Sequence, residues 1–348
     1  MKLKSTLKHC LSLTLILCLG LSLITLSSCN QSETKGLEYE LNADGESYTV
    51  VGSGEAFGYE VNNDLVIPAK HEGKPVTKIA DYAFNRKSLK SIVIPDSVTE
   101  IGEGAFSYCP ADSTGGLETV TIGNGVKIIG KEAFAGNSFL KSIHIPASVT
   151  SIGGGDWITG AFSGCGLTEI TVDEGNTVYD SRNGCNAIIE TATNTLIVGS
   201  SGTVIPNNVT VIGAYAFESA SSELTSITIP ASVTEIGEGA FSGCYKLATV
   251  TLNEGLLSIG KKAFYSIDDL STIVIPNSVT TIGDAAFQAC DNLTKVVIGT
   301  GVTHIDGIAF ANGVNAYSVY YRGTESQWSS IKSGFQYAVE IVYDYTGN

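Results

Sequence analysis

The sequence feature that most constrains the fold is an internal repeat. The stretch Ile229–Phe241, IPASVTEIGEGAF, is the clearest copy of a unit that recurs along most of the chain. Nine Ala-Phe pairs end such units, with their phenylalanines at Phe84, Phe106, Phe134, Phe162, Phe217, Phe241, Phe264, Phe287 and Phe310. The last four are 23 residues apart, a period typical of solenoids, in which each repeat packs on its neighbours. The sequence therefore predicts one repeat stack rather than separate globular cores.

Each repeat is expected to form one coil with an apolar interior. Residues Leu224–Ile229 alternate between apolar and polar, which is typical of a half-buried strand, and Pro230 ends that strand. Val233 and Ile236 supply two more inward residues before Phe241 closes the coil on a short helical or 3-10 segment. We therefore predict an α/β repeat solenoid of short strands and short helical turns, with ladders of Leu, Ile and Phe inside.

Residues 1–28 have the pattern of an export signal. Three lysines precede Leu11–Leu26, an apolar segment that is short for a membrane span. A single transmembrane anchor is the alternative interpretation. The segment ends in Leu26-Ser27-Ser28-Cys29, which resembles the bacterial lipobox. That resemblance implies cleavage before Cys29 and attachment of diacylglycerol to its sulfur, with residues 29–36 as a lipidated tether.

Strand and turn patterns divide the rest of the chain into three parts. Residues 37–64 hold two short apolar runs around Asp44-Gly45, a hairpin signal, and we expect them to cap the first coil. The repeat stack follows over residues 65–313, with an extended repeat at residues 173–206 that predicts a turn and two inserted strands. Residues 314–348 are expected to form a C-terminal cap, in which the capping box Thr324–Gln327 starts a short helix ending by Gly334.

Charge and motif content exclude several functions. The net charge of -15 becomes three units more negative when the leader is removed, which argues against nucleic acid and anionic membranes as partners. The sequence contains no H-E-x-x-H, G-x-S-x-G or P-loop motif and no C-x-x-C pair. We therefore expect no enzyme activity, cofactor or metal, and contact with a membrane only through the lipid anchor.

Four cysteines follow their Ala-Phe pairs by three residues, at Cys109, Cys165, Cys244 and Cys290. Members of this set that lie two repeats apart would have α-carbons about 10 Å from each other, beyond the roughly 7 Å that a disulfide tolerates. We expect these cysteines to be buried thiols whose positions the repeat sets. Cys165 and Cys185 are the one neighbouring pair for which a disulfide stays open.

The repeat text resembles the BspA-type leucine-rich repeat family of bacterial surface proteins, whose units carry the same IPxSVTxIGxxAF sequence. The resemblance covers about Leu65–Phe310, and the flanking segments Leu37–Tyr39 and Tyr320–Thr324 are also similar to the family. It implies a leucine-rich repeat fold, exposure at the bacterial cell surface, and adhesion to proteins of a host or of other bacteria.

Outward strand positions are expected to form two parallel rows on one face of the stack. The first row contains Ser91, Thr119, Ser142, Glu169, Ser226, Thr249, Thr272 and Lys295. The second contains Val93, Thr121, His144, Thr171, Thr228, Thr251, Val274 and Val297. Small β-branched residues pack well on a pleated sheet, so a purely structural role is the alternative to recognition. Thr121, Thr171, Thr228 and Thr251 are our candidate binding residues from these rows.

Trp157 lies in the glycine-rich insertion Gly153–Thr159, which the repeat does not require. An aromatic side chain on an exposed loop lowers solubility unless it packs or binds. Packing on the neighbouring coil is one interpretation. The other is a contact site that Trp157 forms with His144 and Glu169.

These features predict a non-catalytic, lipid-anchored surface protein of the bacterial cell envelope, which binds a macromolecule through the solenoid face and the insertion loops. A protein ligand, from a host matrix or a bacterial surface, is favoured. The alternative is a glycan-binding accessory lipoprotein of a carbohydrate-uptake system. Paired exposed aromatic side chains on one face would favour the glycan, and a bare face of Ser, Thr and Val would favour the protein.

Overall fold

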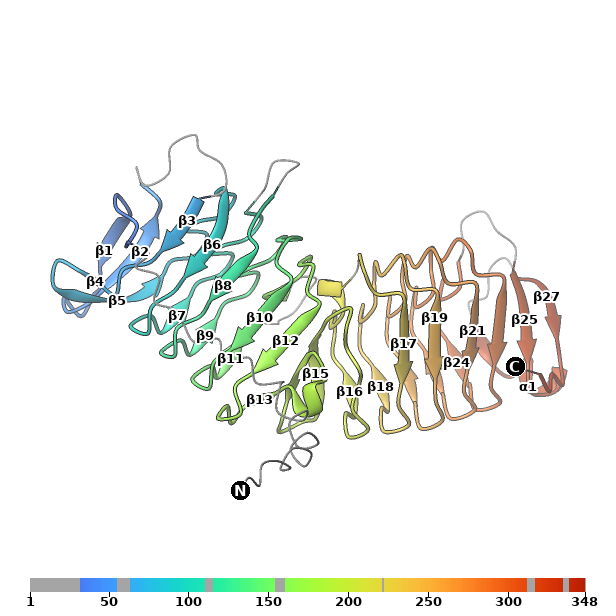
Figure 1. The fold of residues 1–348 in the computed structure, drawn as a ribbon. Helices are drawn as coiled ribbons and strands as arrows, with labels where there is room; N and C mark the ends of the chain where they lie inside the picture. The colour runs from blue at the N-terminus through green and yellow to red at the C-terminus, as the bar shows by residue number, and fades with distance from the viewer. Residues whose placement is uncertain are drawn as a thin grey trace, which may run out of the picture. The chain divides into compact units, whose positions relative to one another are not determined.

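Figure 1 shows the fold as a computed structural model, which describes residues 32–54, 63–109, 115–153, 160–220, 222–311, 317–333 and 338–347. The chain divides into two compact units, Met1–Ser32 and Glu33–Asn348, and the second contains the repeats. Cys29 and Trp157, two of the residues singled out above, lie outside the described residues. Within the described ranges, no helix is long and apolar enough to cross a membrane.

The second unit begins with the hairpin that the sequence predicts. Strands β1 (Glu38–Leu41) and β2 (Tyr48–Gly52) pair antiparallel. The Asp44 carboxylate closes the turn between them by accepting hydrogen bonds from two backbone N–H groups at 2.8 and 3.1 Å, and these bonds lower its pKa. Strand β2 then pairs in parallel with β5 (Lys74–Ile79). The hairpin therefore occupies the edge that the first coil would otherwise expose.

The coils stack in parallel and build two strips of strands (Figure 1). In the first strip most strands have two residues. Its first part contains β2 and β5, followed by β7 (Glu100–Ile101), β9 (Ile128–Ile129) and β11 (Ser151–Ile152), and β4 (Lys70–His71) pairs with β5. Its second part contains β16 (Val211–Ile212), β18 (Glu235–Ile236), β20 (Ser258–Ile259), β22 (Thr281–Ile282), β24 (His304–Ile305) and β26 (Lys332–Ser333).

The second strip consists of longer strands. In chain order they are β3 (Asn63–Val66), β6 (Leu89–Val93), β8 (Thr119–Thr121), β10 (Ser142–Ile145), β12 (Glu169–Val172), β17 (Ser226–Ile229), β19 (Thr249–Leu252), β21 (Thr272–Ile275), β23 (Lys295–Ile298), β25 (Tyr317–Tyr321) and β27 (Ala338–Val342). Most of their inward residues are buried and most outward residues are exposed or half-buried. In β17, for example, Ile227 and Ile229 are buried and Ser226 and Thr228 are exposed. This alternation is the one that the repeat predicts.

The extended repeat interrupts the first strip. Strands β13 (Tyr179–Asp180), β14 (Ala187–Glu190) and β15 (Thr195–Gly199) form an antiparallel meander, with a 3-10 turn at Arg182–Gly184. One sheet of the strip ends at β11, and the next begins at β13 and continues from β15 to β16. The insertion therefore starts a second sheet instead of extending the first.

The interior holds the phenylalanines of the nine Ala-Phe pairs in two ladders. The rings of Phe84, Phe106, Phe134 and Phe162 have centroids 5.4, 5.5 and 5.7 Å apart. Those of Phe217, Phe241, Phe264, Phe287 and Phe310 are 4.5 to 5.1 Å apart. Neighbouring rings within a ladder are within 19° of parallel. Strands in a sheet are also about 4.8 Å apart. The spacing of the stacked rings therefore matches the spacing of the strands in the two strips.

Helical structure is scarce in the described residues. It comprises α1 (Glu325–Trp328), the 3-10 turn at Arg182–Gly184 and another at Glu218–Ala220. Around Phe241 the chain makes single hydrogen-bonded turns, and Gly239 and Gly243 have φ of +59° and +75°. A residue in the left-handed region ends a helical turn. The short helical segments expected in every coil therefore stop after one turn.

The C-terminal cap covers part of the second strip. Thr324 and Gln327 form the capping box that the sequence predicts, although α1 ends at Trp328. Val297, which the sequence places in an outward row, is completely buried, so that expectation is wrong. The Lys295 ammonium beside it lies 5.5 and 5.3 Å from the ring centroids of Tyr320 and Tyr345, because the chain after β27 returns over β23 and β25.

The five cysteines in the described part of the chain are free and buried. This confirms that Cys109, Cys165, Cys244 and Cys290 are buried thiols, and their burial raises the pKa of each to about 12. Cys165 and Cys185 are not bonded to each other, and they belong to different core clusters.

Removing one ring from the middle of a ladder should destabilise the stack. Phe241→Ala deletes a fully buried ring that stacks on Phe217 and Phe264, and we expect a loss of about 3–5 kcal/mol in the free energy of unfolding. Urea unfolding followed by circular dichroism measures this loss. Tyr245→Ala, at an exposed ring, is the control and should change stability by no more than about 0.5 kcal/mol. Equal effects of the two substitutions would contradict the ladder's role.

Candidate functional site

The strand face is the surface that sequence reasoning selected, and we use this name for the two outward rows on the second strip. Thr121, Thr171, Thr228 and Thr251 are exposed. Thr228 and Thr251 are direct register partners on β17 and β19, as are His144 and Thr171 on β10 and β12. The strand face therefore presents aligned polar side chains on a packed sheet.

His144 and Glu169 are exposed on the neighbouring strands β10 and β12. The His144 Nδ1 atom lies 3.0 Å from the Thr171 hydroxyl, whereas Glu169 is the register partner of Ser142. His144 and Glu169 therefore lie diagonally across the strand pair. Their proposed companion Trp157 is outside the described residues, so the three-residue site stays a prediction.

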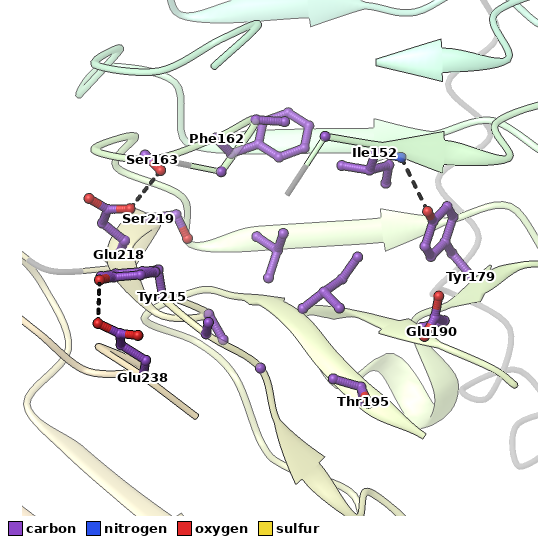
Figure 2. Close-up of a pocket in the computed structure, with 18 residues that line it drawn as sticks. Ile152, Phe162, Ser163, Tyr179, Glu190, Thr195, Tyr215, Glu218, Ser219 and Glu238 are labelled. Carbon is purple, nitrogen blue, oxygen red and sulfur yellow. Dashed lines mark hydrogen bonds between the residues drawn. The ribbon is translucent and has the colours of Figure 1, made fainter. Parts of the chain in front are cut away.

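Sequence reasoning missed a cavity of about 550 Å³ at the interruption between the two phenylalanine ladders. Figure 2 shows the residues that line it. They come from the coil that contains Ile152 and Phe162, from the β13–β15 meander, from the coil that starts with β16 and, for Glu238, from the coil that starts with β18. No ring stacking connects Phe162 to Phe217 in the described structure, whereas every other consecutive pair of these phenylalanines is stacked.

One end of the cavity carries two carboxylates. Glu218 follows Phe217 in a 3-10 turn, and its Oε2 accepts a hydrogen bond of 2.7 Å from the Ser163 hydroxyl, which belongs to the last coil of the first ladder (Figure 2). The Tyr215 hydroxyl donates a longer bond of 3.5 Å to Glu238. Burial raises the pKa of Glu218, and Glu132 adds repulsion, while the bond from Ser163 opposes both effects.

The other end of the cavity is formed by the meander. Tyr179 is buried, and its hydroxyl accepts a hydrogen bond of 3.1 Å from the Ile152 backbone N–H (Figure 2). Glu190 and Thr195 lie at this end as well. Ile197 and Val198 add apolar wall from β15. The Tyr179 contact ties the meander to β11 across the gap between the two sheets.

Gly199, at the end of β15, allows the meander to pack directly against Phe217, the first ring of the second ladder. A Cβ atom at this position would lie 2.4 Å from the Phe217 ring, so any larger residue would push Phe217 out of line. The Gly199 N–H also donates to the Ala216 carbonyl. The meander therefore contacts the first coil of the second ladder at Gly199, where the absence of a side chain leaves room for the Phe217 ring.

The lining defines what the cavity can do chemically. Among the residues that the structure describes, 18 line the cavity, and they include three carboxylates and no Lys, Arg or His. Within the described ranges, no group of three or more His, Cys, Asp or Glu residues is arranged to hold a metal ion. The cavity combines negative charge with apolar walls, which are features of a binding site for small molecules.

The sequence contains one signal for this cavity, the 55-residue step between Phe162 and Phe217. This spacing shows that the repeat is interrupted. It does not show that side chains on either side of the interruption leave a space, because that depends on how the inserted meander packs.

Replacing Glu218 by glutamine should stabilise the protein at neutral pH, because the variant keeps an acceptor for Ser163 and removes a desolvated charge. The raised pKa means that the folded protein takes up a proton more readily than the unfolded chain, so wild-type stability falls as pH rises through the folded-state pKa. We expect Glu218→Gln to raise the melting temperature by about 1–2 °C at pH 7 and the gain to disappear toward pH 4.

The companion variant Ser163→Ala removes the donor to Glu218. It should lower the melting temperature at pH 7, because a buried hydrogen bond to a charged group contributes to stability. Calorimetry between pH 4 and pH 7 measures both variants. A pH-independent difference between Glu218→Gln and wild type would show that burial of the Glu218 charge is not its cause.

Comparisons with known proteins agree with the fold. The BspA type leucine rich repeat region matches residues 55–185 and 200–323, in six copies. A leucine rich cell surface protein from Faecalibacterium prausnitzii A2-165 has 28% sequence identity and a TM-score of 0.55, over 88% of this chain and 98% of that one. The pneumococcal vaccine antigen PcpA has a TM-score of 0.64 with 18% identity, over 90% of this chain and 98% of that one, and shows similarity of fold alone.

None of the curated proteins compared with the chain matches it. The family match covers most of the chain, in two blocks that lie on either side of β14 and β15. Together with the coiled stack of parallel strands, this match shows that the chain belongs to the BspA-type leucine-rich repeat family of bacterial surface proteins.

Proposed function

We propose that this chain is a non-catalytic lipoprotein of the bacterial surface that binds a protein partner through the strand face. The observation that carries the proposal is the alignment of exposed hydroxyl side chains in register along the strands, for example Thr228 with Thr251 and Ser226 with Thr249. The partner is a protein of a host matrix or of another bacterial surface.

Two physical properties support recognition by this face. Its strands are held by buried ladders of Phe, Ile and Leu, so the face changes little in shape when a partner binds. Ser and Thr side chains also lose less conformational entropy on binding than long side chains such as Lys or Gln. A rigid face of short hydroxyl side chains therefore has a low cost of association.

A protein partner is better supported than a glycan. Sugar-binding faces typically expose aromatic rings, and the outward rows from Ser91 to Val297 contain none. The large exposed aromatic side chains in the described structure, Tyr82, Tyr108, Phe139 and Tyr245, lie outside these rows. The strand face is therefore mainly a Ser, Thr and Val surface, with His144, Glu169 and Lys295 among them, and sequence analysis favours a protein for such a surface.

Placing charge on the strand face should weaken partner binding. The double variant Thr228→Glu/Thr251→Glu puts two carboxylates into the row, and we expect affinity to fall at least tenfold because each would be buried without a partner at the interface. The measurement is surface plasmon resonance with residues 30–348 against a panel of extracellular matrix proteins, alongside a glycan array.

The matched control is Thr280→Glu/Thr303→Glu, at two exposed threonines outside the strand face, which should bind normally. Trp157→Ala tests whether the insertion loop adds to the contact. Binding to glycans alone would overturn the choice of a protein partner. Equal loss of affinity in the strand-face variant and its matched control would overturn the choice of the strand face.

The lipid anchor is a separate part of the proposal, supported by the Leu26-Ser27-Ser28-Cys29 sequence. Expressed with its leader in a bacterium, the wild-type chain should partition with membranes and incorporate labelled palmitate, whereas Cys29→Ser should lose the label and become soluble in the absence of detergent. A Cys29→Ser chain that still partitioned with membranes would contradict lipid anchoring.

A further inference from the structure

We propose that the cavity between the two phenylalanine ladders binds an organic cation, that is, an ammonium or guanidinium group joined to an apolar body. The cavity lies among β11, the meander and the coils of β16 and β18, not on the strand face. The inference is therefore independent of the proposed protein-binding function.

The first argument is charge. Glu190, Glu218 and Glu238 line the cavity, and in the described structure none of them forms an ion pair. Glu218 is held by a neutral hydroxyl from Ser163, and Glu238 by a long bond from Tyr215. A partly desolvated carboxylate without a counter-charge is stabilised when a cation binds beside it. The carboxylate end therefore selects a positively charged group.

The second argument is shape and polarity. A volume of about 550 Å³ is within the range of pockets for small organic ligands. Ile152, Phe162, Ile197 and Val198 contribute apolar surface to the lining, which a hydrated inorganic ion cannot use. We therefore expect the ligand to carry an apolar group, joined to its cationic group, that contacts these apolar walls.

The third argument comes from a comparison within the chain. Tyr82 donates to Glu103 at 2.5 Å in the first part of the stack, as Tyr215 does to Glu238 in the second. Each tyrosine ring also lies over the glycine of the next coil, Gly104 or Gly239. Glu103 does not line the cavity, so only the Tyr215 and Glu238 copy of this contact faces the space. The Tyr82 and Glu103 copy supplies a matched control.

The same cationic chemistry is present in a free amine and in a Lys or Arg side chain of a peptide. We would titrate residues 30–348 by calorimetry with phenethylamine, with the uncharged analogue 2-phenylethanol, and with a capped Phe-Lys dipeptide and its acetyl-lysine counterpart. We expect saturable binding of phenethylamine and at least tenfold weaker binding of the alcohol. Tighter binding of the lysine peptide than of phenethylamine would identify a side chain as the natural ligand, and the reverse order a free amine.

The double variant Glu218→Gln/Glu238→Gln preserves shape and removes two charges, so it should bind phenethylamine at least tenfold more weakly, whereas Glu103→Gln should bind as wild type does. If the double variant does not fold, a phenethylamine-dependent rise in the wild-type melting temperature, with none from 2-phenylethanol, tests the same point. The proposal is wrong if phenethylamine does not bind saturably, if the alcohol binds equally well, or if a folded double variant keeps full affinity.

Discussion

Stacking of one buried phenylalanine per coil is the interaction on which the rest of this structure depends. The ring spacing of 4.5 to 5.7 Å within each ladder is close to the distance between hydrogen-bonded strands. One coil can therefore satisfy its backbone pairing and its core packing at the same time. The outward residues of neighbouring coils consequently come into register, as Thr228 and Thr251 do. The strand face is thus a consequence of the ladder inside.

The structure also shows that the stack is built from two similar parts. The Tyr82 to Glu103 contact of the first part recurs as Tyr215 to Glu238 in the second. In the second strip, strand pairing is interrupted between β8 and β10 and again between β19 and β21. Each interruption comes two strands after one of these tyrosine–glutamate contacts, after β6 and β8 in the first part and after β17 and β19 in the second. The family matches likewise form two blocks. The cavity lies where the last coil of the first part meets the first coil of the second, and there the ladder does not continue.

Sequence reasoning could predict what the repeat and other local sequence patterns dictate. Alternation in Leu224–Ile229 predicted a strand with two buried isoleucines, and Thr324–Gln327 predicted a capped helix, because both depend on residues close together in the chain. Burial of Val297 was not predictable from its repeat, since Val297 lies beside the C-terminal cap, where its register partner Tyr320 packs against Tyr345. The cavity was missed for the same reason. Its walls come from four segments whose packing no local pattern specifies.

The ladder explains why the cavity lies where the repeat is interrupted. Inside a regular coil, the inward positions must be apolar and sized to the coils above and below, since a void or a buried charge would destabilise every layer that touches it. Glu218 occupies a position just after the ladder ring Phe217, but no phenylalanine stacks on the outer side of that ring. Gly199 of the meander lies against this ring instead, and the Ser163 hydroxyl donates to Glu218. At such an interruption a carboxylate can face a neighbouring hydroxyl instead of a complete apolar layer, and there the fold leaves a volume of about 550 Å³.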